Sequence, residues 1–81
     1  MLHDGYKKVY KFGNGYGASV VCNQFSYGGD KGLFEVAVLD MAGNIVYDTP
    51  VTGDVLGFLG FDGVAKTLQE IQSLPTTLTL E

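Results

Sequence analysis

Apolar and polar residues alternate along two neighbouring stretches near the start of the chain. Tyr6–Phe12 (YKKVYKF) places an aromatic or long side chain at every second position, and Ala18–Gln24 (ASVVCNQ) is rich in β-branched residues. Both patterns are typical of strands on a pleated surface. Between them lies Asn-Gly, the residue pair that most favours a hairpin turn with positive φ. We therefore predict a first β-hairpin over residues 6–24.

A second pair of predicted strands follows a glycine-rich loop. Leu33–Asp40 (LFEVAVLD) is the most apolar stretch and is predicted to be a central strand. Asp40–Gly43 (DMAG) has Asp and Gly at the first and fourth places of a type I turn, which predicts a three-residue hairpin loop with a glycine bulge. Asn44–Thr49 (NIVYDT) is then the predicted fourth strand, ended by Pro50 because proline cannot donate to a ladder.

The last third of the chain has the spacing of a helix. Its apolar residues recur at intervals of four and three, which places them on one helical face: Val64, Leu68 and Ile71. Asp62 is the predicted N-terminal cap, and Pro75 ends the helix. Residues 52–60 (TGDVLGFLG) are predicted to form only a short helical turn, because glycine disfavours a longer one.

These elements predict an α+β fold: a four-stranded antiparallel β-meander with one C-terminal amphipathic helix packed on one face, in the order β-β-β-β-α. The 81 residues suit a single domain, 1–81, with an ordered core from about 6 to 75. The strand at 33–40 is apolar on both sides. Either another copy or another protein covers the second face of the sheet, or long side chains of neighbouring strands shield a central strand.

Composition and charge narrow the function. The formal net charge is −4, arginine is absent, and Lys7, Lys8 and Lys11 are three of the five lysines. This argues against nucleic-acid binding, which normally needs a dense basic face to neutralise phosphates. No stretch approaches the ~20 apolar residues of a membrane span, and the start of the chain lacks the apolar run of a signal peptide. We therefore expect a cytoplasmic protein with no membrane association.

Phe12–Val21 (FGNGYGASVV) fits the phosphate-loop spacing G-x-G-x-x-[GA]-x-V. A kinase would also need a lysine on its third strand, and the predicted strand at 33–40 has none. A dinucleotide-binding loop would run into a helix, whereas a strand-like stretch follows here. The spacing therefore indicates a hairpin turn. A small ligand-binding or nucleotide-binding domain that uses Gly13–Gly17 is retained as the third functional hypothesis.

Catalytic and metal-binding patterns are weak. Cys22 and His3 are the single cysteine and histidine of the chain, and Cys22 falls within an apolar strand, where free cysteine packs as a small hydrophobic residue. One Cys and one His do not make a zinc site. The aspartates fall mostly in predicted turns and caps. We therefore predict no catalytic residues, no metal ligands and no cofactor, and a protein that is not an enzyme.

Two loop tyrosines are the candidate contacts with a partner. Tyr16 lies in the first hairpin loop and Tyr27 in the loop SYGGDKG, both beside glycines. Exposed tyrosine offers a large contact area with few rotatable bonds, so it is favoured at interfaces. With Asn14 of the same turn, Tyr16 and Tyr27 form the predicted partner-binding set. The alternative is that each tyrosine folds back to cover the end of a small core.

Four stretches carry a family resemblance: NGYGASVV, SYGG…GLFEVAVLD, G…YDTPVTGDVLGFL and the closing V…L…I…LP. Over nearly its whole length the chain resembles a set of small uncharacterised proteins of tailed phages and prophages. The resemblance implies an accessory phage gene product in the cytoplasm of a bacterial host, and it transfers no activity. Gly60–Phe61 stands where such proteins have a Thr-Pro helix start, which puts the start of the helix in question.

The leading hypothesis is therefore a non-enzymatic phage or prophage accessory protein that acts as a protein-interaction module, with a host or phage protein as its partner. The alternative is a structural or self-assembling protein, whose apolar second sheet face is buried in a homodimer.

Overall fold

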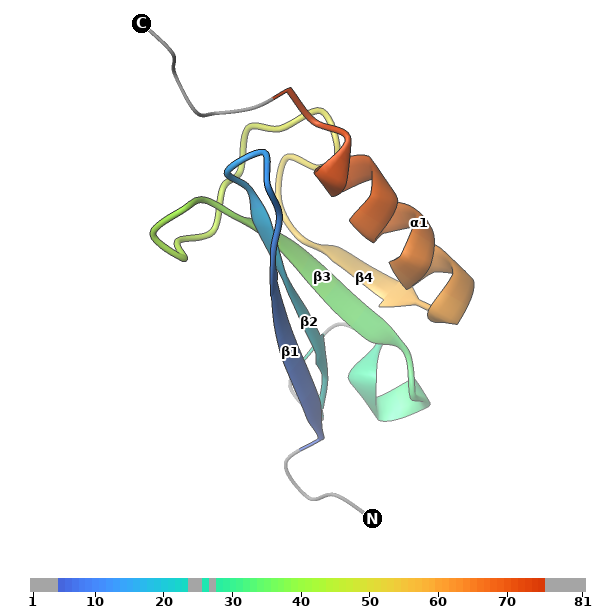
Figure 1. The fold of residues 1–81 in the computed structure, drawn as a ribbon. Coiled ribbons are helices and arrows are strands. Elements are labelled where there is room, and N and C mark those ends of the chain that lie inside the picture. The colour runs from blue at the N-terminus through green and yellow to red at the C-terminus, as the bar shows by residue number, and fades with distance from the viewer. Residues whose placement is uncertain (1–4, 24–25, 27, 76–81) are drawn as a thin grey trace, which may run out of the picture.

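The sheet and the helix occur in the predicted order (Figure 1). The computed structural model describes residues 5–23, 26 and 28–75. It contains a four-stranded antiparallel sheet in the order β1-β2-β3-β4 and one α-helix, which confirms the predicted α+β fold. The elements are β1 (Tyr6–Lys11), β2 (Gly17–Cys22), the 3-10 turn η1 (Gly29–Lys31), β3 (Phe34–Leu39), β4 (Leu56–Leu59) and α1 (Phe61–Gln72).

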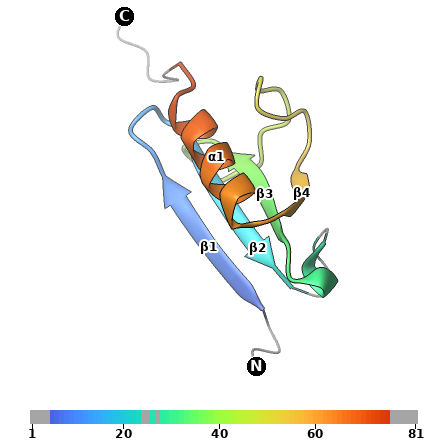
Figure 2. The same ribbon diagram turned by 90° about the vertical axis from the view of Figure 1, so that its right-hand side faces the viewer.

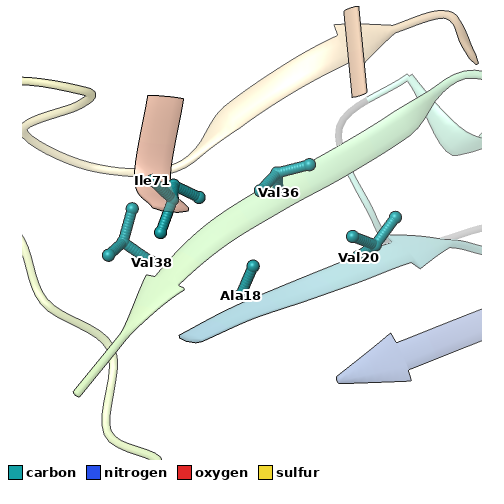
Figure 3. Close-up of a cluster of buried hydrophobic side chains, with 5 residues drawn as sticks. All are labelled: Ala18, Val20, Val36, Val38 and Ile71. Carbon is teal, nitrogen blue, oxygen red and sulfur yellow. The ribbon is translucent and has the colours of Figure 1, made fainter. Parts of the chain in front are cut away.

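The core lies between the helix and the two central strands. Ala18 pairs with Val38, and Val20 pairs with Val36, so that four small or β-branched side chains form one buried patch. Ile71 of α1 is fully buried against this patch, as Figure 3 shows. The helix packs on β2, β3 and β4, while β1 lies to one side of it (Figure 2).

The fourth strand differs from the prediction. Beyond the hairpin loop that joins Asp40 and Asn44, residues 44–49 pair with β3 through the bridge of Leu39 with Ile45 and the bond that Val46 N donates to Val38 O at 2.8 Å. The chain then leaves the sheet and returns as β4, which pairs with the other half of β3. The predicted strand at 44–49 and the predicted helical turn at 52–60 are therefore both wrong.

Tertiary burial explains this exchange. The bridge at Leu39 and the pairing of Val36 with Leu56 both lie on the same edge of β3, so the fourth strand is interrupted by an excursion over residues 47–55 (Figure 1). A turn in which Thr52 N donates to Thr49 Oγ1 at 3.3 Å holds the excursion, and Thr49 is buried. Leu59 packs on the core, which local propensity does not anticipate.

The helix begins earlier than predicted. Gly60 is its N-terminal cap and makes no side-chain hydrogen bond, so the expectation of Asp62 as the cap is wrong. Asp62 lies in the first turn, where its negative charge favours the amino end of the helix. The helix ends at Gln72, before Pro75, as predicted. Among the described residues, no helix is long and apolar enough to cross a membrane.

The face of the sheet opposite the helix, here called the open face, carries alternate residues of three strands: Lys7, Val9 and Lys11, then Gly17, Ser19 and Val21, then Glu35, Ala37 and Leu39. Its centre is covered by the chain itself, since Ala37 and Leu39 are only 4% and 7% exposed. The middle of this face is therefore buried within the single chain. The partners of Ala37 and Leu39 on β2 are Ser19 and Gly17, so shielding by long neighbouring side chains stays a prediction. Exposed apolar residues lie nearer its margins, with Val9 at 48% and Ile45 at 42%.

Candidate interaction site

The loop between β1 and β2 is a three-residue hairpin loop. Phe12 N donates to Tyr16 O at 2.9 Å, and Gly15 N donates to Phe12 O at 3.3 Å. Gly15 has φ 91°, whereas Asn14 does not adopt positive φ. The hairpin is confirmed, but its turn is a glycine bulge closed by Gly15 and not a two-residue Asn-Gly turn.

Two amides of this loop, those of Gly15 and Tyr16, already donate within it. Gly15 N donates within the loop, and Tyr16 N donates to Asn14 Oδ1 at 3.0 Å. A phosphate loop instead directs its amides at the ligand. The hollow of about 250 Å³ beside this loop is also lined by Asp40, whose carboxylate would repel a phosphate. These contacts disfavour the nucleotide hypothesis for Gly13–Gly17.

The Asn14 side chain ties this hairpin to the end of the helix. Its Nδ2 group donates to three backbone carbonyl oxygens, those of Ile71 at 2.8 Å, Gln72 at 3.1 Å and Leu74 at 3.1 Å. The last carbonyls of a helix have no partner within the helix, so a donor from elsewhere stabilises them. The structure thus gives this predicted partner-binding residue an internal role, which is a C-terminal cap.

The candidate tyrosines fall in different places. Tyr16 is half-buried and packs against the core cluster, so the structure shows it next to the fold's own core. Tyr27 lies outside the described residues. The structure thus brings Asn14 and Tyr16 together in one loop, and partner binding through these residues stays a prediction.

The candidate thiol lies at the end of a strand. Cys22 is the last residue of β2, is half-buried, and has its Sγ atom 3.9 Å from Gly29 O. Cys22 therefore lies within the predicted strand, but at its end and not in its middle, because β2 begins and ends earlier than the pattern indicated. His3 lies outside the described residues. Within the part of the chain that the structure describes, no group of three His, Cys, Asp or Glu residues could hold a metal ion.

A groove that no pattern in the sequence indicates lies between β1 and α1. It has a volume of about 450 Å³ and is here called the aromatic groove. The sheet contributes Tyr6, Tyr10, Val20 and Phe34, and the helix contributes Phe61, Val64, Ala65 and Leu68. The ring of Phe34 contacts two neighbours, Tyr6 at a centroid distance of 5.6 Å edge-on and Phe61 at 5.5 Å. Such ring contacts are favourable beyond the apolar area that they bury.

The groove exists because the helix is offset from the sheet. α1 packs on β2, β3 and β4, and β1 extends past it (Figure 2). Phe61 is consequently 80% exposed, and Tyr6 is 41% exposed. The sequence did contain a signal, since Phe61 continues the apolar helical stripe by one turn before Val64. Only the tertiary structure shows that the sheet leaves the Phe61 end of this stripe uncovered.

β1 is basic although the chain is acidic. It carries three exposed lysines, of which Lys8 lies on the side of the aromatic groove and Lys7 and Lys11 lie on the open face. Lys8 Nζ lies 5.2 Å from the centre of the Tyr10 ring, a cation–π contact that holds the ammonium at the groove. Positive charge is therefore gathered beside exposed aromatic rings on one strand.

Comparison of the chain with protein-family models, with curated proteins and with solved structures gave no match.

Proposed function

We propose that the protein is a non-enzymatic interaction module that binds another protein through the aromatic groove. The observation that carries this proposal is the pair of exposed rings at the groove entrance, Phe61 at 80% and Tyr6 at 41% exposure. Exposed aromatic residues that gather beside a hollow are characteristic of protein interfaces, where their burial supplies most of the binding energy.

The form of the groove supports a protein partner. Its lining is almost wholly apolar and aromatic, with the hydroxyl groups of Tyr6 and Tyr10 as the side-chain polar groups among the lining residues. A small-molecule site usually adds a few convergent polar groups that orient the ligand. An apolar side chain from another protein needs only contact with these rings, and Lys8 adds a positive charge at the margin of the groove.

The resemblance to proteins of tailed phages and prophages supports a more specific proposal. In this proposal the protein is an accessory protein that acts in the cytoplasm of a bacterial host, and its partner is a host or phage protein. The groove then contributes the recognition that such a protein needs in the absence of an activity of its own.

Capture from a bacterial lysate tests the proposal. The protein is immobilised as the original chain and as Phe61→Ser and Tyr6→Ser, and the bound proteins are identified by mass spectrometry. Met41→Ser and Tyr47→Ser are matched controls, because these residues are 67% and 56% exposed and lie away from the groove. We expect one captured protein to be lost with both groove variants and kept with both controls. Equal capture by all five proteins would contradict the proposal.

A second candidate is a homodimer formed through the open face. Val9 and Ile45 are both partly exposed there, and they line a shallow hollow that also includes Lys7 and Ser19. Burial of these apolar residues against a second copy would favour association. Sedimentation at micromolar concentration separates the two candidates, since a clean monomer rules out the dimer. If the dimer forms and Val9→Ser dissolves it, the open face is the interface.

A further inference from the structure

We propose that the partner binds as an extended acidic segment that adds to the free edge of β1 as a fifth, antiparallel strand. This inference rests on the proposed function, because the added strand places its side chains against the open side of the aromatic groove. Backbone hydrogen bonds to β1 would supply affinity, and the side chains along β1 would select the sequence.

Of the two edges of the sheet, β1 is the one suited to a further strand. β4 has four residues, its pairing with β3 is shifted between Phe34 and Val36, and Phe58 within it has φ 57°. A short, bulged edge is a poor template for pairing. β1 has six residues in an unbroken register with β2, from Tyr6 opposite Cys22 to Lys11 opposite Gly17.

The closing bond of the first hairpin fixes which backbone groups of β1 point outward. Phe12 N donates to Tyr16 O, so this pair is of the hydrogen-bonded kind. In an antiparallel ladder the two kinds of pair alternate. Alternate residues from 6 to 10 therefore direct their N–H and C=O groups at β2, and Lys7, Val9 and Lys11 direct theirs at the free edge. Three donors and three acceptors are thus presented in a row.

The side chains of β1 define the partner's pattern. On the open face, Lys7 and Lys11 flank Val9, which calls for acidic residues on either side of a β-branched one. On the helix side, Lys8 lies between Tyr6 and Tyr10, which calls for an acidic residue between two apolar ones that reach the groove. Cross-strand pairs of opposite charge stabilise a sheet, and like charges destabilise it. Read antiparallel to β1, the matching segment is Glu-Leu-Val-Glu-Glu-Phe.

A second copy of this chain does not fit the same edge. For two β1 strands to pair antiparallel about a two-fold axis and keep matching faces, the axis must pass through a residue position. The two registers with the longest overlap of β1 are those centred on Lys8 and on Val9. Centred on Lys8, the pairing sets Lys8 against its own copy, and centred on Val9, it sets Lys7 against Lys11. The lysines therefore oppose self-pairing, as edge lysines commonly do, and leave an acidic partner as the fitting occupant.

The test is a titration of the whole chain with a capped synthetic peptide, Gly-Ser-Glu-Leu-Val-Glu-Glu-Phe-Gly-Ser, followed by NMR of the backbone amides. We expect the largest shifts at the outward amides of Lys7, Val9 and Lys11, with smaller shifts along α1 at the groove. Raising the salt concentration tenfold should weaken binding several-fold, because exposed charges are then screened. A peptide with lysine in place of glutamate is the control and should not bind.

Val9→Pro isolates the backbone contribution. The N–H of Val9 points outward, so proline removes a donor for the added strand while the ladder with β2 keeps its bonds. We expect at least a tenfold loss of peptide affinity with Val9→Pro and less than a twofold loss with Val9→Ala. The double variant Lys7→Glu with Lys11→Glu checks the charge independently, since it should lose the acidic peptide and bind the lysine peptide instead.

The outcomes separate this inference from the proposed function. Equal binding by Val9→Pro, no binding at millimolar peptide, or shifts confined to the open face would each overturn strand addition. If strand addition fails while Phe61→Ser still abolishes capture from lysate, the groove binds a partner in another way. If sedimentation instead shows the original chain pairing with itself and Val9→Pro abolishes the dimer, the occupant is a second copy and the acidic partner is wrong.

Discussion

The two hairpins of the molecule have the same backbone and different roles. In each, a closing amide donates across the loop at 2.9 Å, from Phe12 to Tyr16 and from Asp40 to Asn44. In each, a glycine at the third loop position has nearly the same positive φ, 91° at Gly15 and 90° at Gly43. Local turn chemistry therefore builds both loops in the same way.

The two hairpins differ in what the polar side chain of each loop binds. Asp40 Oδ1 accepts from Ala42 N and Asn44 N, both at 2.9 Å, so this carboxylate stabilises its own exposed loop. Asn14 closes its loop through Oδ1 and uses Nδ2 to cap a helix more than fifty residues away. The first hairpin is thus a tertiary joint, by which we mean that Asn14 connects its loop to the C-terminal end of α1. The second hairpin is a local turn that is stabilised only from within its own loop.

Exchange of the two polar residues should give the largest contrast. In Asn14→Asp the donor to three carbonyls at and just beyond the helix end is lost. A negative charge then faces the negative end of the helix, so we expect a loss of about 2–3 kcal/mol of unfolding free energy. Asp40→Asn keeps the accepting Oδ1 atom and should cost less than about 0.5 kcal/mol, as surface changes usually do. Urea denaturation of both variants measures the difference. Equal losses would mean that Asn14 is not the joint.

Alanine at the two bulge glycines should give a smaller and more even effect. Both positions need positive φ, which costs a residue with a side chain about 1–2 kcal/mol. We expect the loss of unfolding free energy in Gly15→Ala and in Gly43→Ala to lie in this range. The two variants should differ instead in which amides exchange faster. Amide hydrogen exchange should accelerate at the end of α1 in Gly15→Ala, and near the loop alone in Gly43→Ala. Unchanged exchange at the helix end in Gly15→Ala would contradict the coupling.

The same contrast explains what could be predicted from the sequence. Asn-Gly and Asp-Met-Ala-Gly marked both hairpins because their signals lie within five residues. The strand at 33–40 and the helix followed from local periodicity in the same way. Residues 44–49 and 56–59 are both short and apolar, and both meet the same edge of β3. Only burial in the assembled core therefore decides which part of that edge each segment pairs with. The aromatic groove likewise depends on the offset between α1 and β1, to which no short pattern refers.

The excursion after the second hairpin should respond to a change at its anchor. Thr49 is buried and its Oγ1 atom both accepts from Thr52 N and donates to Thr52 O, each at 3.3 Å. Thr49→Val removes these two long bonds and keeps the shape, so we expect a loss of about 1 kcal/mol. Thr52→Val is the comparison variant, because it leaves the Thr49 bonds to the backbone intact and removes instead the exposed bond that Asp54 N donates to Thr52 Oγ1 at 3.0 Å. Unchanged unfolding free energy in Thr49→Val would show that Thr49 does not anchor the excursion.

The smallest expected effect concerns the first hairpin as a phosphate loop. Its glycine spacing suggests a nucleotide, yet the second hairpin repeats the same backbone from a sequence without that spacing, so the geometry serves the turn. The amides of Gly15 and Tyr16 donate within the loop, and a ligand would have to break those bonds. We therefore expect no local amide shift over Gly13–Gly17 at millimolar ATP, with Asp40–Asn44 as the internal reference. A saturable shift confined to the first loop would show that a phosphate displaces these contacts. The glycines of this loop would then be explained by nucleotide binding and not by its connection to the helix.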